Sequence, residues 1–509
     1  MIEAWSTDAV YAAERSLMVT LDDGELMARA VEGLAGVAAA RLEETGAEAV
    51  AALVGPGNNG ADALYAVARL AAAGWNAVAV HHDQVHEGAR AAAEAAGVVL
   101  TTDPSGLGEA DVVLDGILGI GARPGLPEWA VGWLAALSET AHVIAVDLPS
   151  GQDPMGGDLD PDGVFADETV TFSVAKPVHL LPPTEQACGL LTVVDIGLEV
   201  DDGPVVRRLD HDDVAALWPV PVATDDKYSR GVVGVVAGGE SYSGAAVLCV
   251  TAAAESGSGM VRYVGTPVPT GLVRAAVPEA VHGAGRVQAW VVGPGLDVSS
   301  TAAGAAAQLD VAREALAGAE PVVVDAGGLD LLDLAVLQAR SAAVTLLTPH
   351  AGECARLLSR LGGVPAPTNR AISAQGGAPT STDEVTREQV ESRPLAHARA
   401  LAQLTGATVL LKGATTLVVP PGAGATVWSQ CDAPPWLATA GAGDVLAGLL
   451  GTLLAAGLPA DVAGALGALV HGVAAERANP GGPVRALAVA SAIPAAVAHL
   501  LGRAGTSAP

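Results

Sequence analysis

The chain has 509 residues, half of them hydrophobic and only 16% charged, which is enough apolar material for two or more domains with large cores. Its formal net charge is −30, and this excess of negative charge argues against a nucleic acid or an anionic membrane as a partner. The four cysteines lie far apart and show no metal-ligand spacing, so they predict free thiols in a reducing compartment.

Neither the N-terminal residues nor the most apolar stretch of the chain predicts a signal peptide or a membrane span. Residues 1–15 contain acidic side chains and no apolar core, so they do not predict a signal peptide. Residues 445–473 form the most apolar stretch, but Pro459 and Asp461 interrupt it, which predicts two buried helices rather than a membrane span. We therefore expect a cytoplasmic protein without a membrane partner.

The first third of the chain alternates helices with short apolar strands. A Gly-rich turn at residues 55–62 joins the first strand to a helix, which is the phosphate-cradling arrangement of parallel α/β folds. The alternation predicts a parallel, doubly wound sheet, with helices at residues 7–21, 24–45, 63–73, 86–96 and 127–138 and strands at residues 47–54, 76–81, 110–114 and 142–146.

Polar side chains follow three of these strands. Asn59 lies in the first turn, Asp115 ends the next strand but one, and Asp147 and Ser150 follow the last. Because the carboxyl ends of parallel strands meet at one edge of a sheet, we expect these side chains to lie close together. Four oxygen donors indicate a site for a hard cation or a substrate; the alternative is that each caps its own turn.

The middle of the chain predicts a linker and then a second α/β unit. Residues 199–204 and 210–226 are acidic and contain proline, which is typical of a linker. Residues 361–394 are rich in Pro, Gly, Ser and Thr without periodicity, which predicts a solvated insertion loop. Between these two segments the predicted elements are strands at residues 232–237, 261–264, 287–292, 321–324 and 344–347 and a helix at residues 246–256.

A Gly-rich stretch at residues 438–448 leads into a predicted apolar helix at residues 445–458. Backbone N–H groups at a helix N-terminus form an anion site that suits a phosphate. Asp444 puts a carboxylate at the mouth of that site, where it would repel phosphate. One role for it is a general base that takes the proton from a hydroxyl about to attack a phosphate; the other is a helix cap.

The motifs of the first third resemble those of the NAD(P)H-hydrate epimerase domain over about residues 4–207. They are Gly-Asn-Asn-Gly-x-Asp at residues 57–62, Asp-x-x-x-Gly-x-Gly at residues 115–121 and Asp-x-Pro-Ser-Gly at residues 147–151. The resemblance implies a Rossmann-like doubly wound α/β/α sandwich. Ala61 and Ala63 stand where that family usually has glycine, so the turn is either crowded by two methyl groups or adapted to them.

This resemblance also implies the roles of individual residues. Asn59, Asp115 and Ser150 would hold a potassium ion, and Asp147 would be the catalytic acid/base. The residues implied to contact the hydrated nucleotide are Asn58, Asn59, Gly60, Ala61, Asp62, Gly119, Ile120, Gly121, Ala122, Arg123, Pro124, Gly125 and Asp147.

Four further motifs resemble, in order, those of the ribokinase-like NAD(P)H-hydrate dehydratase domain over about residues 210–501. They are Gly-Pro-Gly at residues 293–295, Thr-Pro-His-x-Gly-Glu at residues 348–353, Lys-Gly at residues 412–413 and Gly-x-Gly-Asp at residues 441–444. Asp297 departs from the family pattern, in which glycine is common at that turn. The resemblance implies that Asp444 is catalytic, that Ala245, Gly295, His350 and Asp444 contact the substrate, and that the nucleotide is held by Lys412, Gly413, Ala414, Thr415, Thr416 and Gly443.

The two resemblances together imply an enzyme with two activities, an epimerase domain at residues 1–208 and a dehydratase domain at residues 209–509. The epimerase would interconvert the R and S hydrates of NADH and NADPH (NADHX and NADPHX). The dehydratase would restore NAD(P)H from the S hydrate with ADP as phosphoryl donor, or alternatively ATP, and Mg²⁺, and would release AMP and phosphate. We also expect a homo-oligomer.

Two other functions remain open from the sequence. The C-terminal part would also suit a ribokinase-like kinase of a small alcohol or vitamin precursor, which makes a stable phosphorylated product. The N-terminal part would then be a non-catalytic interaction domain, although such a domain has no need of Asn59, Asp115, Asp147 and Ser150.

Overall fold

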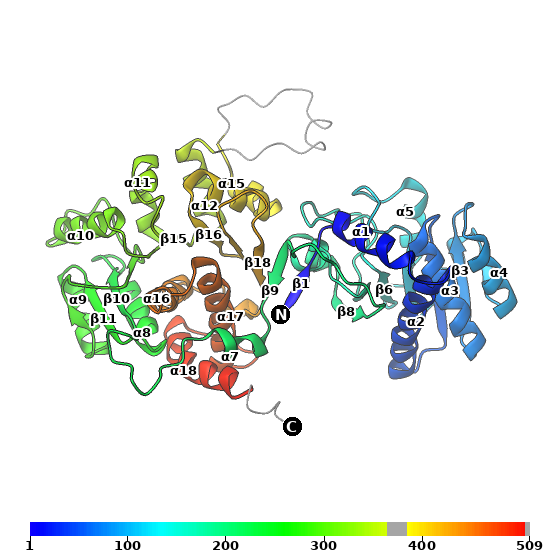
Figure 1. Ribbon diagram of the computed structural model, residues 1–509, viewed down its shortest axis with the longest axis horizontal. Coiled ribbons are helices and arrows are strands. Elements are labelled where there is room, and N and C mark those ends of the chain that lie inside the picture. The colour runs from blue at the N-terminus through cyan, green and yellow to red at the C-terminus, as the bar shows by residue number, and fades with distance from the viewer. Residues whose placement is uncertain (364–383, 504–509) are drawn as a thin grey trace. The chain divides into compact units, whose positions relative to one another are not determined.

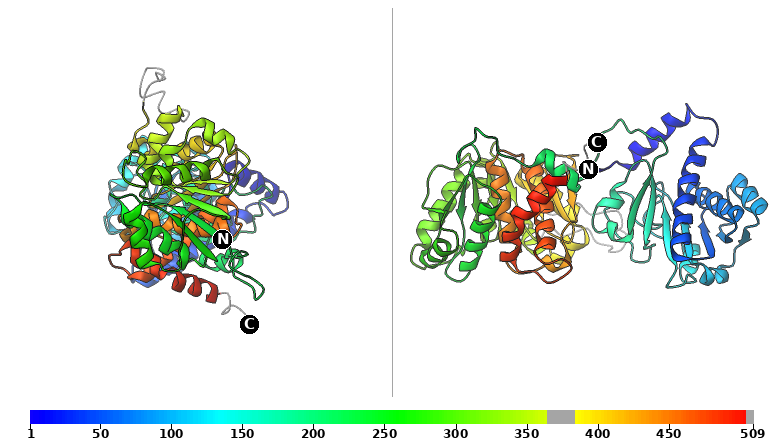
Figure 2. Two further views of the ribbon diagram at one scale, coloured as in Figure 1. Left: turned by 90° about the vertical axis from the view of Figure 1, so that its left-hand side faces the viewer. Right: turned by 90° about the horizontal axis from the view of Figure 1, so that it is seen from below.

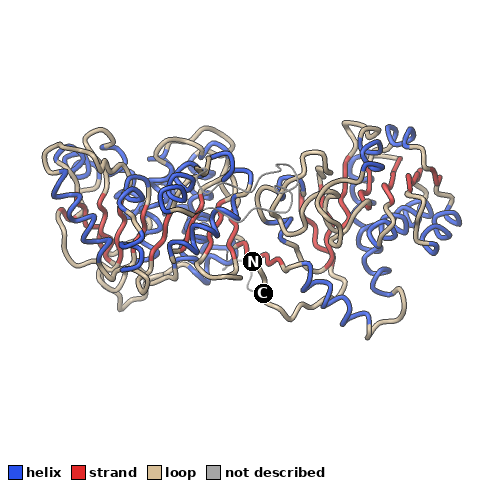
Figure 3. The backbone as a smooth tube through the Cα atoms, turned by 90° about the horizontal axis from the view of Figure 1, so that it is seen from above, coloured by secondary structure: helices blue, strands red, loops and turns tan. Residues whose placement is uncertain are grey.

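The computed structural model describes residues 1–363 and 384–503 (Figure 1). The chain divides into two compact units, Glu3–Val206, called here the N-terminal unit, and Arg207–Pro509 together with Met1–Ile2, called the C-terminal unit. In each unit the strands form a central layer between helices (Figure 3). The α/β class predicted for both parts is confirmed. Among the described residues, no helix has the length and apolar character needed to cross a membrane.

The N-terminal unit contains a seven-stranded sheet in the order β4-β3-β2-β5-β6-β7-β8, and every neighbouring pair is parallel. Its central strands are buried on both faces, which is why they read as continuous apolar runs. The strands are β2 (Ala49–Val54), β3 (Asn76–His81), β4 (Val99–Thr101), β5 (Val112–Gly116), β6 (His142–Val146), β7 (Glu168–Phe172) and β8 (Leu190–Val194). The helices are α1 (Thr7–Met18), α2 (Glu25–Thr45), α3 (Asn58–Ala73), α4 (Glu87–Ala96), α5 (Glu128–Leu134) and α6 (Pro177–Leu180).

The C-terminal unit is built on an eleven-stranded sheet in the order β1-β9-β18-β17-β16-β15-β14-β13-β10-β11-β12. The strands from β12 to β16 are parallel, whereas β16, β17 and β18 form an antiparallel meander. The strands are β1 (Ile2–Ala4), β9 (Val206–Arg208), β10 (Val232–Val236), β11 (Met260–Val264), β12 (Val281–His282), β13 (Ala289–Val292), β14 (Val322–Val324), β15 (Thr345–Leu347), β16 (Thr408–Leu411), β17 (Thr416–Val419) and β18 (Val427–Gln430).

Helices cover both faces of this sheet. Among them α16, α17 and α18, coloured orange to red, pack together (Figure 2). The two buried helices predicted within residues 445–473 are confirmed as α16 and α17. The helices are α7 (Val214–Leu217), α8 (Ser243–Glu255), α9 (Pro267–Ala276), α10 (Ala305–Ala317), α11 (Leu334–Ala339), α12 (Ala351–Leu361), α14 (Arg387–Ser392), α15 (Pro394–Thr405), α16 (Ala442–Ala455), α17 (Ala460–Ala478) and α18 (Ala486–Arg503).

Two predicted loop segments are partly wrong. The acidic stretch at residues 210–226 is not a linker throughout, because it contains α7, and Val214 and Trp218 lie in the core of the C-terminal unit. In the predicted insertion loop, residues 364–383 lie outside the described residues, but α14 follows them with Thr386 as its N-cap and Val390 buried. In both places a short helix is held by one or two buried apolar side chains. Polar residues lie close to them in the sequence, so the sequence pattern does not predict the helix.

Two helices begin earlier than predicted, and both changes affect the sites described below. The asparagines of the first Gly-rich turn form the first turn of α3, and Gly443 and Asp444 lie in the first turn of α16. Each helix has a glycine as N-cap, Gly57 or Gly441, and no side chain caps it. The first N–H groups of both helices are therefore left for other acceptors.

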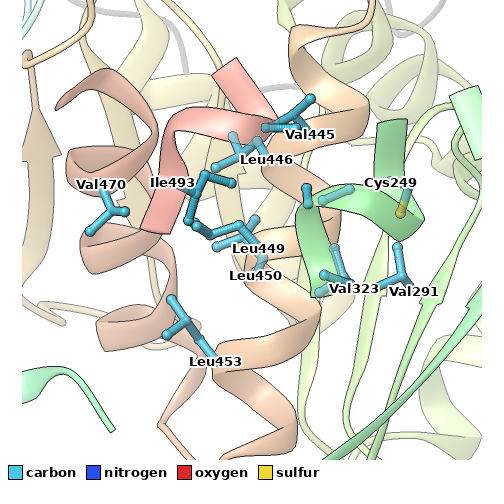
Figure 4. Packing of buried hydrophobic residues seen from close by; sticks show 14 of the residues in the cluster. Cys249, Val291, Val323, Val445, Leu446, Leu449, Leu450, Leu453, Val470 and Ile493 are labelled. Carbon is cyan, nitrogen blue, oxygen red and sulfur yellow. The ribbon is translucent and has the colours of Figure 1, made fainter. Parts of the chain in front are cut away.

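Buried apolar side chains of α8, α16, α17 and α18 pack against one another and against the sheet in the C-terminal unit (Figure 4). A Cβ added at Gly448 of α16 would lie 2.2 Å from the backbone oxygen of Cys249 in α8. Leu449 and Leu450 beside it are fully buried in the same cluster. Glycine at this position therefore sets the distance between α8 and α16.

Gly448→Ala is expected to lower the free energy of unfolding by about 1–3 kcal/mol, because the added methyl group must push the two helices apart. Gly271→Ala is the matched control, since a Cβ added there, within α9, meets nothing within 4 Å. This control is expected to raise the free energy of unfolding by about 0.5–1 kcal/mol through helix propensity. Urea titration measures both changes, and a shift of the same sign in both variants would contradict the packing argument.

Candidate functional site

Asn59, Asp115 and Ser150 meet around the backbone of Leu118. The Ser150 Oγ donates to Asp115 Oδ1 at 2.6 Å, and Leu118 N donates to that Oγ at 2.9 Å. The Asn59 Nδ2 donates to the oxygens of Leu118 at 3.1 Å and of Val146 at 2.6 Å. The structure thus brings a carboxylate, a hydroxyl and two carbonyl oxygens together, with the amide NH₂ of Asn59 turned toward both carbonyls. With that amide reversed, these groups would form a set of hard oxygen donors of the kind that a cation takes.

Asp115 is fully buried at the end of β5. Burial raises its pKa to about 6, against the lowering effect of hydrogen bonds from Ser150 and from Ile117 N. A cation at this point would favour the ionised carboxylate, because opposite charge offsets the cost of desolvation. Among the described residues, no group of three or more His, Cys, Asp or Glu side chains is placed to hold a metal ion, so any cation here relies on neutral oxygen donors as well.

Asp147 is held from several sides immediately after β6. Its Oδ1 accepts from Lys176 Nζ at 2.5 Å and from Thr171 Oγ1 at 2.8 Å, and its backbone oxygen lies 2.8 Å from His179 Nε2. The residue has a φ of 68°, which is uncommon for a side chain other than glycine. Lys176 is only 1% exposed, so this is a buried ion pair whose geometry fixes the carboxylate.

A cavity of about 1260 Å³ opens beside this cluster. Glu14 and Tyr11 of α1 line it, and α2 contributes apolar side chains. Of the residues expected to contact the substrate, those that line the cavity are Asn58, Asn59, Asp62, Gly119, Ile120, Gly121, Ala122 and Asp147.

The remaining predicted contacts of this unit lie elsewhere. Arg123 and Pro124 are exposed, and Gly60 is buried at the start of α3. Ala61 and Ala63 are buried in the core of the N-terminal unit. Their methyl groups therefore fill the interior, which favours an adapted turn over a crowded ligand site.

In the C-terminal unit, Lys412 connects three strand ends. Its backbone N–H donates to Pro349 O at 2.9 Å, and its Nζ donates to Asp325 Oδ1 at 2.7 Å. The same Nζ lies 3.8 Å from Glu353 Oε2. Asp325 is buried after β14 and also accepts from Thr348 Oγ1 at 2.8 Å. A Cβ added at Gly443 would lie 3.3 Å from Lys412 Nζ, so the lysine faces the first turn of α16.

Asp444 lies in this charged environment. Burial and the nearby carboxylate of Asp325 raise its pKa to about 7, although Lys412 counteracts them. Burial alone would lower the pKa of Lys412, but Asp325 and Glu353 more than offset that effect and raise it. Asp444 is not the N-cap of α16, a position that Gly441 occupies. A carboxyl group that titrates near neutral pH beside an uncapped helix N-terminus can exchange a proton next to bound phosphate.

The other residues predicted in this unit are placed as follows. His350 caps α12: its Nδ1 accepts from Gly352 N at 3.0 Å and from Glu353 N at 3.3 Å. Burial lowers its pKa. Gly295 lies against Ala245, because a Cβ at residue 295 would be 2.5 Å from the Cβ of residue 245. The predicted nucleotide contacts Gly413, Ala414, Thr415 and Thr416 lie at the β16–β17 turn, exposed or half-buried.

Sequence reasoning missed Lys176 and Asp325, the two ion-pair partners. A signal was present for the first, because the chain has only three lysines, Lys176, Lys227 and Lys412, among its 26 basic residues. In a chain that otherwise uses arginine, a lysine marks a position where a compact point charge is needed. Two of these three lysines pair with a buried carboxylate at a candidate site.

Lys176→Met is expected to lower the free energy of unfolding by about 3–5 kcal/mol, because it leaves Asp147 buried without its counter-ion. Arg90→Met is the control: it breaks a pair with Glu94 in which the side chains are 50% and 58% exposed, and such pairs contribute less than about 1 kcal/mol. Chemical denaturation of both variants measures the difference. Equal, small losses would mean that the buried pair does not hold the carboxylate in place.

Comparison with known proteins matches both units to families. Residues 233–493 match the family described as NAD(P)H-hydrate dehydratase, and residues 23–178 match the family described as YjeF-related protein N-terminus. The chain is 41% identical over 499 residues to the bifunctional NAD(P)H-hydrate repair enzyme Nnr of Mycobacterium leprae, covering 94% of each chain. It is 42% identical over 474 residues to the enzyme of the same name from Mycobacterium tuberculosis H37Rv, covering 91% of each.

Among solved structures, the chain is similar to an ADP/ATP-dependent NAD(P)H-hydrate dehydratase from Bacillus subtilis, with 21% identity and a TM-score of 0.46. That similarity covers 58% of this chain and 99% of the other. The high identity over nearly the whole length of the mycobacterial proteins, with one family matched in each unit, settles the assignment. The chain belongs to the family of bifunctional NAD(P)H-hydrate repair enzymes.

Proposed function

We propose that the dehydratase domain predicted at residues 209–509 acts on the S hydrate of NADH or NADPH by transient phosphorylation, with Asp444 as the general base. The hydrate carries a hydroxyl on the reduced nicotinamide ring, and hydroxide leaves poorly at neutral pH. Asp444 accepts the hydroxyl proton while the oxygen attacks a nucleotide phosphate. Phosphate then leaves with the C–O bond electrons, and loss of a ring proton restores the double bond.

The arrangement of Lys412, Asp325 and Asp444 at the uncapped N-terminus of α16 is the observation that carries this proposal. The N–H groups around Gly443 would stabilise the developing charge on the phosphate. Lys412 and the turn at residues 413–416 would hold the nucleotide, for which we propose ADP, converted to AMP and phosphate. Mg²⁺ would accompany the phosphates and neutralise part of their charge. Ala245, Gly295 and His350 would contact the hydrate.

Asp444→Asn is expected to lower dehydratase turnover by about two to four orders of magnitude, the usual contribution of a positioned base. In the wild type, kcat/KM should fall as the pH drops below about 7, because Asp444, whose pKa is raised to about 7, then takes up a proton and no longer acts as a base. Asp310→Asn, at an exposed position of α10, is the control that should keep wild-type turnover. Wild-type turnover in Asp444→Asn would rule out the base.

We propose that the domain predicted at residues 1–208 is the epimerase that interconverts the R and S hydrates. The carbon inverted lies next to the ring nitrogen, whose lone pair can expel the hydroxyl. The protein then needs mainly a proton donor and acceptor near that carbon. Asp147, fixed by Lys176, would act as acid/base, and residues 58–62 and 119–125 would contact the nucleotide. Potassium held by Asn59, Asp115 and Ser150 would keep the strand ends together.

The epimerase rate of the wild type is therefore expected to be high in K⁺ and low when choline replaces it. Ser150→Ala is expected to lose most of the epimerase activity, and its remaining rate should be the same in both cations. The reason is that Ser150 supplies one donor and also orients Asp115. Ser138→Ala, which removes an exposed hydroxyl paired with Thr140, should leave the dependence on K⁺ unchanged. An epimerase rate independent of the cation in wild-type protein would exclude the potassium site.

We further propose that the enzyme acts in the cytoplasm as a homo-oligomer. Cys188, Cys249 and Cys354 are buried free thiols, which supports a reducing compartment. The kinase alternative is not favoured, because residues 233–493 match the NAD(P)H-hydrate dehydratase family and nearly the whole chain matches a bifunctional NAD(P)H-hydrate repair enzyme.

A further inference from the structure

Asp62 differs from Asp115 and Asp147 in that no described residue donates a hydrogen bond to one of its carboxyl oxygens, Oδ1. It lies in α3, lines the cavity and is only 7% exposed. Its Oδ1 is buried and has no hydrogen-bond partner among the described residues. Buried carboxylates are normally hydrogen-bonded, and an unpaired buried charge is costly. A protonated carboxyl group avoids most of that cost.

The charges around Asp62 come from several elements. Glu14 of α1 and Asp147 after β6 both act on it with negative charge. The buried cation Lys176 donates to Asp147 and Thr171. The helix α2 presents apolar side chains to the cavity, and the other ionisable groups that line it are Tyr11, Asp22, Asp23, Tyr65, Arg69 and His86.

We propose that Asp62 is the proton donor of the epimerisation, a neutral carboxylic acid that works beside the ionised carboxylate of Asp147. The proposal rests on the epimerase chemistry proposed above. Two carboxyl groups with opposite environments, one paired with lysine and one with no cation, are the arrangement that divides acid and base roles.

The proposed epimerisation has two stages, loss of the hydroxyl and addition of water. The Asp62 O–H bond breaks and its proton joins the hydroxyl of the hydrate, so that the C–O bond breaks and water leaves. The lone pair of the ring nitrogen forms the C=N bond of an iminium ion, and the carboxylate of Asp147 stabilises its positive charge. Water then attacks the opposite face, where the carboxylate of Asp147 takes its proton, and the electron pair returns to nitrogen. Proton exchange with solvent then restores protonated Asp62 and ionised Asp147.

The electrostatics agree with this assignment. Burial, together with Asp147 and Glu14, raises the pKa of Asp62 to about 8. The acid form is therefore populated at neutral pH and is lost as the pH rises through that value. Because the pKa is raised in the folded state, the stability contributed by protonated Asp62 is full below about pH 4 and disappears between there and pH 8.

The test uses the full-length chain and purified R hydrate of NADH. The epimerisation rate is measured as a function of pH, after subtraction of the spontaneous rate. In the wild type, kcat/KM should fall above about pH 8. Asp62→Asn should lower kcat by about 10²-fold or more and remove the alkaline fall. Asp8→Asn, an exposed residue of α1, should match the wild type.

A second measurement is independent of activity. The urea midpoint of Asp62→Asn, relative to the wild type, should shift upward as the pH rises from about 4 to 8, because only the wild type must ionise a buried carboxyl. An unchanged alkaline fall, a change in KM alone, or a midpoint difference that does not vary with pH would overturn the proposal. Wild-type protein no faster than the spontaneous reaction would instead overturn the epimerase assignment on which the proposal rests.

Discussion

A buried carboxylate stays ionised only where nearby positive charge or hydrogen bonds compensate for its lost hydration, and at each candidate site one lysine supplies that charge to one carboxylate. Lys176 holds Asp147 in the N-terminal unit and Lys412 holds Asp325 in the C-terminal unit. In both, a further carboxyl group nearby has no such partner, and its pKa is raised: Asp62 to about 8 and Asp444 to about 7. The same arrangement thus leaves each site with a group that exchanges protons near neutral pH.

Parallel strands make this arrangement possible in both units. Asp115, Asp147, Asp325 and Lys412 all follow strands at the carboxyl edge of a sheet, where side chains distant in sequence converge. The helices that begin at this edge, α3 and α16, start with glycine and leave their first N–H groups uncapped. Charged side chains are therefore positioned by strand ends, next to helix N-termini of the kind that suit an anion.

The sequence patterns predicted about half of the strands in the described residues, those with apolar runs in the parallel parts of the two sheets, because apolar runs and Gly-rich turns are local signals. The starts of α3 and α16 were placed too late, since Asn and Gly favour turns as much as helix N-termini. Lys176 and Asp325 were missed because their partners are 29 and 87 residues away, and pairing at that range depends on strand order. The isolation of Asp62 is likewise a property of packing, not of its motif.

The two units together allow one chain to repair both hydrates. The most direct measurement supplies purified R hydrate of NADH to the full-length protein with Mg²⁺ and either ADP or ATP, and follows the near-ultraviolet absorbance of the restored dihydronicotinamide ring. We expect complete recovery with the wild type and, with Asp147→Asn, recovery only at the spontaneous epimerisation rate. Absence of recovery with both nucleotides, or full-speed recovery in Asp147→Asn, would contradict the account.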